Sequence, residues 1–117
     1  RDLMSKRVVT LTPGMDVLRA AQIFLDEGIS GAPVVDEHGN LLGMLTQRDC
    51  LDVGLAGVYY REPAGCVRDY MKSPVRTVEA TATLAEILEA FRSSRYRRFP
   101  VLEGNRLVGQ ISRGVFQ

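Results

Sequence analysis

Tryptophan is absent from this sequence, histidine occurs once and cysteine twice, and each scarcity excludes a class of function. The single histidine, His38, lies in an expected turn, where a side chain is usually solvated. Because the sequence has no other histidine, we do not expect a His-based catalytic triad. Cys50 and Cys66 are sixteen residues apart with no CxxC pattern, which predicts neither a zinc motif nor a disulfide framework. We therefore interpret both cysteines as reduced thiols and expect no metal site.

Long apolar runs and net charge are also missing. No apolar run approaches the ~20 residues that cross a bilayer, and the opening segment "RDLMSKRVV" is not a secretory signal. A formal charge of +1 gives no global attraction to nucleic acid or anionic lipid. We expect a soluble, cytoplasmic protein without membrane contact, in which any site for a polyanion is local.

The chain is long enough for one domain, and its sequence contains the same structural unit twice. A shift of 67 residues aligns it with itself, and the shift becomes 66 after one deletion in a turn. The identities under the first shift are Arg1, Asp2, Met4, Val8, Thr10, Phe24, Pro33 and Val34 with Arg68, Asp69, Met71, Val75, Thr77, Phe91, Pro100 and Val101. Because the copies also share an order of expected elements, we interpret them as a tandem duplication.

Each copy has one strongly periodic helix, which we interpret as a core helix with its apolar face buried. Apolar residues spaced i, i+3, i+4, i+7 fall on one helix face in both copies: Val17, Ala20, Ala21 and Phe24, and Leu84, Ile87, Leu88 and Phe91. Asp16 is the expected cap of the first helix and Gly28 its stop, while Thr83 and Glu86 form a capping box for the second.

Two short strands follow each helix. The segments "APVVD" and "FPVLE" read as strands with Pro33 and Pro100 at the first position, and a hairpin turn leads to the next strand. The predicted fold class is α+β: two repeats of short strand, helix, strand, strand and helix, related by a pseudo-twofold axis. Small mixed sheets are expected, with helices packed between the repeats.

The predicted domain boundaries follow the duplication. Residues 1–56 form the first repeat, 57–67 a connecting loop and 68–117 the second repeat. The chain stops at "SRGVF", where the last helix should only be starting. We therefore expect either a piece of a longer polypeptide or a small stand-alone protein.

The two copies differ where the last strand ends. The first copy reads "GMLTQRD" and the second "GQISRGV", so the acid Asp49 is matched by Val115. Thr46 and Asp49 fit a capping box. The same hydroxyl could instead bind a phosphate at the helix N-terminus, and the carboxylate could accept hydrogen bonds from a ribose diol. The segment alone leaves both interpretations open.

An arginine cluster precedes the second strand of the second copy. "RSSRYRRFP" carries four arginines, whereas the equivalent "GISGAP" of the first copy is uncharged. Such a cluster is often a solvated face. Around a pseudo-twofold axis, however, Arg97 and Arg98 can point into a cleft between the copies, where guanidinium groups suit phosphate. The aromatic Tyr96 among these cations also leaves single-stranded nucleic acid as a less favoured partner.

These motifs resemble a tandem pair of CBS domains, also called a Bateman module, over essentially the whole chain. The likeness rests on "VVTLTP", on "GISGAPVVDEHGNLLGMLTQRD" and on its partner "SRYRRFPVLEGNRLVGQIS". The resemblance implies clefts that bind an adenosine-containing ligand such as AMP, ADP, ATP or S-adenosylmethionine, with no further cofactor. It also implies a homodimer.

The resemblance further implies which residues line two composite clefts. In the main cleft these are Met44, Thr46, Arg48, Asp49, Lys72, Ser73, Pro74, Val75, Tyr96, Arg97 and Arg98. In the second they are Lys6, Arg7, Ile29, Ser30, Gly31, Ser112 and Arg113. Val115 stands where the family has its ribose-binding acid, so the second cleft departs from the pattern.

We therefore expect a non-catalytic regulatory module that senses an adenosine-containing ligand and transmits its occupancy to a partner or an attached domain. No pair of nucleophile and base is evident, so we do not expect an enzyme. A structural dimerisation module whose clefts bind nothing is the main alternative. The sequence leaves open which nucleotide binds and which domain responds.

Overall fold

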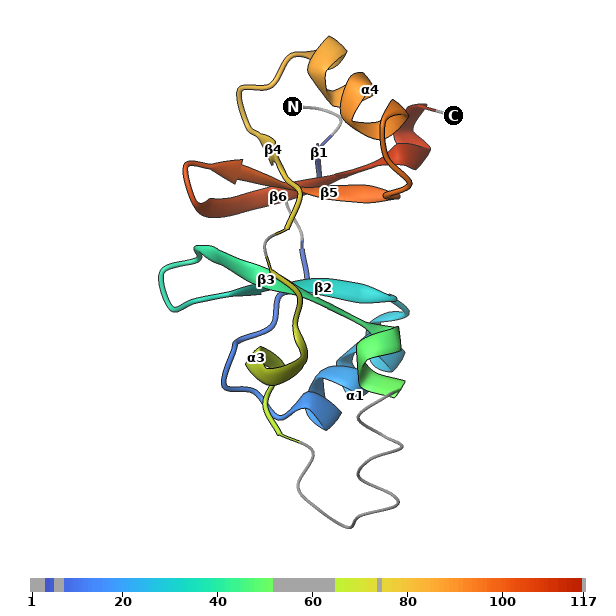
Figure 1. Ribbon diagram of the computed structural model, residues 1–117. Coiled ribbons are helices and arrows are strands. Elements are labelled where there is room, and N and C mark those ends of the chain that lie inside the picture. Colours follow the sequence, from blue (N-terminus) through green and yellow to red (C-terminus); the bar gives the residue numbers. More distant parts are fainter. Residues whose placement is uncertain (1–3, 6–7, 52–64, 74, 117) are drawn as a thin grey trace.

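The structure of the protein is a computed structural model that describes residues 4–5, 8–51, 65–73 and 75–116 (Figure 1). The first repeat contains β1 (Met4–Ser5), α1 (Val17–Glu27), β2 (Gly31–Val35), β3 (Leu41–Thr46) and a helical segment at 47–51. The second contains α3 (Val67–Tyr70), β4 (Val78–Glu79), α4 (Leu84–Arg92), β5 (Arg98–Glu103), β6 (Arg106–Ser112) and the 3-10 helix η1 (Arg113–Phe116). Lys6, Arg7, Pro74 and most of the expected loop 57–67 lie outside the described residues.

The first helix, α1, forms as predicted. The Asp16 side chain accepts a hydrogen bond from the Leu18 amide at 2.8 Å, which caps the N-terminus. One helix face is buried, through Val17, Ala20 and Phe24. Gly28 ends the helix with φ 66°, a left-handed conformation that glycine adopts without a Cβ penalty.

The second core helix, α4, has the predicted cap but a different buried face. Thr83 and Glu86 exchange the two hydrogen bonds of a capping box. Phe91 is buried, with Ile87 and Ala90 packed against the same core, whereas Leu84 and Leu88 are 53% and 43% exposed. The prediction that Leu84 and Leu88 lie in the core is wrong, because the stripe that meets the sheet runs through 87, 90 and 91.

Within the described ranges, six strands form two small sheets. One has the order β1-β6-β5-β4, with β4 parallel to β5, and the other is the antiparallel pair β2-β3. Pro33 and Pro100 are third in their strands, not first as predicted. The β2 proline is tolerated because its carbonyl accepts from the Leu11 amide at 2.9 Å, so the outer edge pairs without a proline N–H.

The repeats exchange their first extended segments. β1 of the first repeat pairs with β6 of the second, with Ser5 opposite Gln110. The equivalent bridge joins Lys72, at the start of the second repeat, to Met44 of β3. The hairpin tips also meet, because Leu41 and Leu107 donate to the carbonyls of Asn105 and Gly39 at 2.9 Å. These matched bonds give the pair its pseudo-twofold symmetry.

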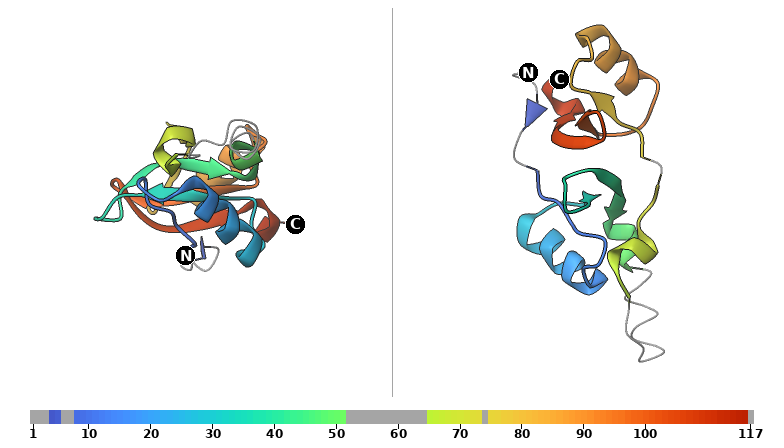
Figure 2. Two further views of the ribbon diagram at one scale, coloured as in Figure 1. Left: turned by 90° about the horizontal axis from the view of Figure 1, so that it is seen from below. Right: turned by 90° about the vertical axis from the view of Figure 1, so that its left-hand side faces the viewer.

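The two sheets lie toward each other in the middle of the molecule, and the helices cover their outer faces (Figures 1 and 2). The predicted class of mixed helices and small sheets is confirmed, but the helices do not lie between the repeats. There are two core clusters, and each includes a residue of the other repeat: Val67 of α3 is buried in the cluster around Phe24, and Met4 of β1 packs against the cluster around Phe99. Among the described residues, no helix has the length and apolar character needed to cross a membrane.

Candidate functional site

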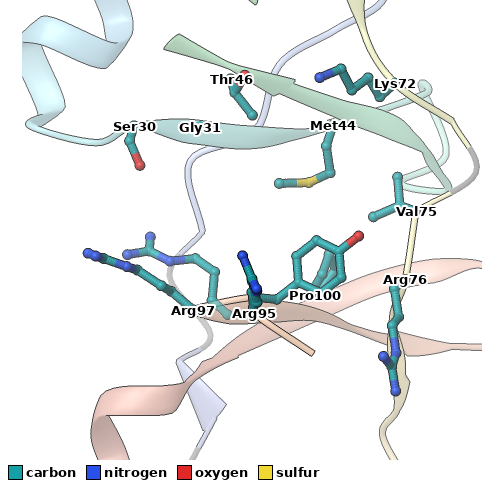
Figure 3. Close-up of a pocket in the computed structure, with 12 residues that line it drawn as sticks. Ser30, Gly31, Met44, Thr46, Lys72, Val75, Arg76, Arg95, Arg97 and Pro100 are labelled. Carbon is teal, nitrogen blue, oxygen red and sulfur yellow. The ribbon is translucent and has the colours of Figure 1, made fainter. Parts of the chain in front are cut away.

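A cleft of about 520 Å³ lies between the two sheets. Both repeats contribute to its walls, and Figure 3 shows Met44 of β3 above Arg95, Arg97 and Pro100 of the second repeat. The lining residues are Ser30, Gly31, Met44, Thr46, Lys72, Val75, Arg76, Arg95, Tyr96, Arg97, Arg98 and Pro100. The volume falls within the roughly 300–1,000 Å³ of small-molecule sites.

The cleft combines an apolar bed with a cationic rim. Met44, Val75 and Pro100 supply the apolar side chains, and Tyr96, with 54% of its surface exposed, packs its ring 5.6 Å from that of Phe99. Five lining residues are cationic, and none of the described lining residues is acidic. Arg76 is partly engaged, because its guanidinium donates to Ser93 at 3.0 Å and lies over Phe99. Such a surface suits a flat ring that carries anionic groups.

The structure gathers seven of the residues predicted for the main cleft. These are Met44, Thr46, Lys72, Val75, Tyr96, Arg97 and Arg98. Arg48, Asp49 and Ser73 are described but do not line it, and Pro74 is outside the described residues.

Five lining residues were not predicted for this cleft. Arg76, Arg95 and Pro100 were not assigned to either cleft, although Arg95 belongs to the arginine cluster that the sequence shows. Ser30 and Gly31 were assigned to the second cleft. The duplication could have indicated Ser30 and Gly31, because they are the equivalents of Arg97 and Arg98, which are predicted to line this cleft.

Asp49 is held as a helix cap. Its Oδ2 accepts hydrogen bonds from the Thr46 amide at 2.9 Å and the Thr46 hydroxyl at 3.0 Å, and the carboxylate is almost fully buried. The Asp49 amide donates in return to Thr46 Oγ1 at 3.4 Å. Lys72 Nζ lies 3.6 Å from Asp49 Oδ1, so this carboxylate also links the two repeats. Asp49 therefore contacts two residues of the cleft wall, Thr46 and Lys72.

The same backbone bond closes the end of each hairpin. The Gln47 amide donates to the Ser30 carbonyl at 2.8 Å, and the equivalent Arg113 amide donates to Arg97 at 2.6 Å. This bond places the turn before each first hairpin strand beside the end of the second. Local pairing thus delivers uncharged Ser30 and cationic Arg97 to matching edges of one cleft.

The described residues that were predicted for the second cleft line three different hollows. Ser112 and Arg113 line a cavity of about 620 Å³ whose other described lining residues all belong to the second repeat: Arg95, Arg97, Arg98 and Gly114. Ile29 and Ser30 line a separate hollow of about 410 Å³ together with Arg98. The guanidinium of Arg113 is directed to its own repeat, because it donates to the carbonyls of Phe91, Ser94 and Tyr96.

The two cysteines are free thiols that differ in burial. Cys50 is buried, and burial together with the Asp49 charge raises the pKa of its thiol, which makes it a poor nucleophile. Cys66 is also a free thiol. In the part of the chain that the structure describes, no group of three or more His, Cys, Asp or Glu residues could hold a metal ion.

Comparison with known sequences places both repeats in one family. A sequence model of the CBS domain matches residues 1–56 and 67–114. The uncharacterized protein MJ1225 of Methanocaldococcus jannaschii is 29% identical over 112 residues, which cover 96% of this chain and 39% of that protein. The uncharacterized protein YlbB of Bacillus subtilis is 32% identical over 116 residues, covering 97% of this chain and 76% of that protein. The chain thus spans well under half the length of MJ1225.

Solved structures share the fold. CBSX2 of Arabidopsis thaliana, solved with AMP, has a TM-score of 0.82 at 24% identity, covering 97% of this chain and 88% of that chain. Hypoxic Response Protein I, solved with two zinc ions, has a TM-score of 0.80 at 28% identity, with coverages of 98% and 93%. The CBS domain pair of MJ0100, solved with 5-methylthioadenosine and S-adenosyl-L-methionine, has a TM-score of 0.75 at 22% identity, with coverages of 98% and 92%.

Proposed function

This chain belongs to the CBS domain family, and from that premise we propose that it is a non-catalytic regulatory module that binds an adenine nucleotide between its repeats. The observation that carries the proposal is the cleft itself, in which an apolar bed adjoins five cationic side chains with no acid among the described lining residues. An adenine ring needs such a bed, and phosphate groups need such cations.

The charge of the cleft favours nucleotides over S-adenosylmethionine. AMP, ADP and ATP place negative charge beside Lys72, Arg97 and Arg98, whereas the sulfonium of S-adenosylmethionine adds a cation to that set. CBSX2 and MJ0100 were solved with adenosine-containing ligands, and their likeness to this chain extends to the fold. The choice among ligands therefore rests on the charges of this chain.

We further propose that Asp49 accepts hydrogen bonds from the ribose hydroxyls of the ligand. Its two partners, Thr46 and Lys72, both line the cleft, so its carboxylate lies one residue behind the wall. A phosphate that attracts Lys72 would weaken the ion pair and free Asp49 Oδ1 for a ribose hydroxyl. Ligand entry would then break one of the links between the repeats.

Ligand occupancy can be transmitted through the contacts that join the repeats. The exchanged β1–β6 pair, the Met44–Lys72 bridge and the hairpin tips hold the sheets together around the cleft. A ligand that binds one spacing of the sheets better than another shifts the population toward that spacing. We propose that a second copy of the chain, or an attached domain, senses this shift.

The test is a titration of AMP, ADP, ATP and S-adenosylmethionine by calorimetry, with the variants Arg97→Gln and Arg19→Gln. Arg97 lines the cleft, whereas Arg19 is an exposed cation of α1. We expect nucleotide binding that Arg97→Gln weakens about tenfold, the loss of one charge-assisted contact, and that Arg19→Gln leaves unchanged. No binding of any ligand at millimolar concentration would sink the proposal and favour a structural dimerisation module.

A further inference from the structure

Three arginines separate the cleft from the second cavity. Arg95, Arg97 and Arg98, which we call the arginine ridge, line the cleft of about 520 Å³ and also the cavity of about 620 Å³. The two hollows differ in chemistry. The cleft has an apolar bed, but the described lining of the second cavity consists of arginines, Ser112 and Gly114. The described lining of the second cavity therefore suits phosphate oxygens and includes no apolar or aromatic side chain.

The charges of the ridge are uncompensated. Within the described residues, the ion pairs of the protein involve His38, Lys72 and Arg92, and none involves a ridge arginine. All three ridge side chains are exposed, and they are gathered within four positions of the chain. Like charges held close together repel one another, and a polyanion that touches all three would relieve that repulsion.

The backbone that carries the ridge is fixed before any ligand arrives. Arg113 donates to the carbonyls of Phe91 (2.6 Å), Ser94 (2.8 Å) and Tyr96 (3.1 Å), and its guanidinium lies 5.4 Å from the Phe91 ring centre. Its amide also holds Arg97. The turn between α4 and β5 is thereby tied to the end of β6. A preorganised cationic turn loses little entropy when it binds an anion.

We propose that the phosphate chain of the nucleotide crosses the arginine ridge into the second cavity, so that the module selects nucleoside triphosphates over monophosphates. This inference rests on the proposed function, because the base must lie in the cleft. The α-phosphate contacts Lys72 and the ridge, and the terminal phosphate lies beside Ser112, whose hydroxyl can donate to it. Affinity then rises with the number of phosphates.

The experiment measures dissociation constants for AMP, ADP, ATP and inorganic triphosphate by calorimetry in magnesium-free buffer. The test variant is Ser112→Glu, which places a negative charge in the second cavity. Its control is Thr81→Glu, which adds the same charge at an exposed position before the opposite end of α4. Arg95→Gln serves as a second test, because it removes one ridge cation without adding an acid. Thermal unfolding without ligand checks that each variant is folded.

For the unaltered protein and Thr81→Glu we expect ATP to bind at least about tenfold more tightly than AMP, with ADP between them. Ser112→Glu should bring the ATP to AMP ratio close to one, and Arg95→Gln should lower it. Equal or tighter binding of AMP would overturn this inference and leave the proposed function standing. An ATP preference that survives both Ser112→Glu and Arg95→Gln would also overturn it.

Failure of the proposed function gives a different result. If no nucleotide binds but inorganic triphosphate does, the ridge is an anion site without a base, and both proposals fail. A single-stranded oligonucleotide is a further arm of the titration. Tight oligonucleotide binding that falls steeply with salt, with no binding of free nucleotides, would instead identify a nucleic-acid surface and overturn both.

Discussion

The two repeats have the same backbone arrangement but differ in the charge of the side chains that it carries. In both, a backbone bond ties the residue after the hairpin to the turn before it, through Gln47 and Ser30 in one and Arg113 and Arg97 in the other. In the first repeat that turn is small and uncharged. In the second it carries the arginine ridge, and the Arg113 side chain adds three hydrogen bonds to it. Duplication thus accounts for the shared backbone, and divergence at a few turn positions accounts for the cationic side chains of the second repeat.

The largest effect should come from the matched core phenylalanines. Phe24→Ala and Phe91→Ala each remove a buried ring from one core cluster, and each should cost about 3–5 kcal/mol. Because the repeats exchange their first strands, urea unfolding followed by circular dichroism should show one transition for each variant. Two separated transitions in either variant would mean that the repeats fold independently.

The next effect tests the contact between the repeats. A Cβ at Gly43 would lie 2.7 Å from the Lys72 carbonyl oxygen, so Gly43→Ala should push the Met44–Lys72 bridge apart and cost about 1–3 kcal/mol. At Gly14 an added Cβ meets nothing within 4 Å. Gly14→Ala should therefore change the free energy of unfolding by less than about 0.5 kcal/mol. Equal effects of the two substitutions in urea unfolding would contradict the close approach.

The third prediction exchanges the residues that distinguish the repeats. Arg113→Gln gives the second repeat the residue of the first and removes the guanidinium that donates to the carbonyls of Phe91, Ser94 and Tyr96. It should cost about 1–3 kcal/mol and weaken nucleotide binding by loosening the ridge. The reverse change, Gln47→Arg, should alter stability by less than about 0.5 kcal/mol. Thermal unfolding and calorimetry measure both, and a harmless Arg113→Gln would show that the ridge holds its position without Arg113.

A smaller effect is expected at the cap. Asp49→Asn weakens the hydrogen bonds to Thr46 and removes the charge that faces Lys72, so it should cost about 1 kcal/mol. Urea unfolding measures the stability, and calorimetry shows whether nucleotide affinity falls as well. A loss of stability with unchanged affinity would restrict Asp49 to capping.

The smallest effect concerns the capping box of the second repeat. A hydrogen bond from the Thr83 amide, together with one from the Thr83 side chain, lowers the pKa of Glu86 below its ordinary value of 4.5. The contribution of Glu86 is therefore present above that value and is lost as the pH falls through the lowered pKa of the folded state. The fall in stability between neutral and acid pH should be slightly smaller in Glu86→Gln. An identical pH profile would assign the cap to Thr83 alone.

Local patterns in the sequence predicted the elements better than their packing. The helix caps at Asp16 and Thr83 and the stop at Gly28 are correct, because capping depends on residues within a few positions of one another. The expected burial of Leu84 and Leu88 is wrong, because a short amphipathic helix can roll by part of a turn against its sheet. Sequence periodicity does not fix that rotation.

For the candidate site, too, local motifs were predictable and long-range placements were not. Resemblance to CBS domains indicated seven residues that line the cleft, since the motif positions are fixed by strand ends. It did not indicate that Arg113 would be occupied by carbonyl oxygens, or that Ser30 and Gly31 would face the same cleft as their equivalents Arg97 and Arg98. Those placements depend on pairings between residues far apart in the chain.

By itself, the sequence determined the duplication, the order of helices and strands in each copy and the unequal distribution of arginine between them. Those features are written in spacings of a few residues or in one long repeat. Only the tertiary structure decided that the sheets face each other with helices outside, that first strands are exchanged and that one ridge borders two hollows. These depend on hydrogen bonds such as that between Met44 and Lys72, whose partners are brought together only when both repeats are folded.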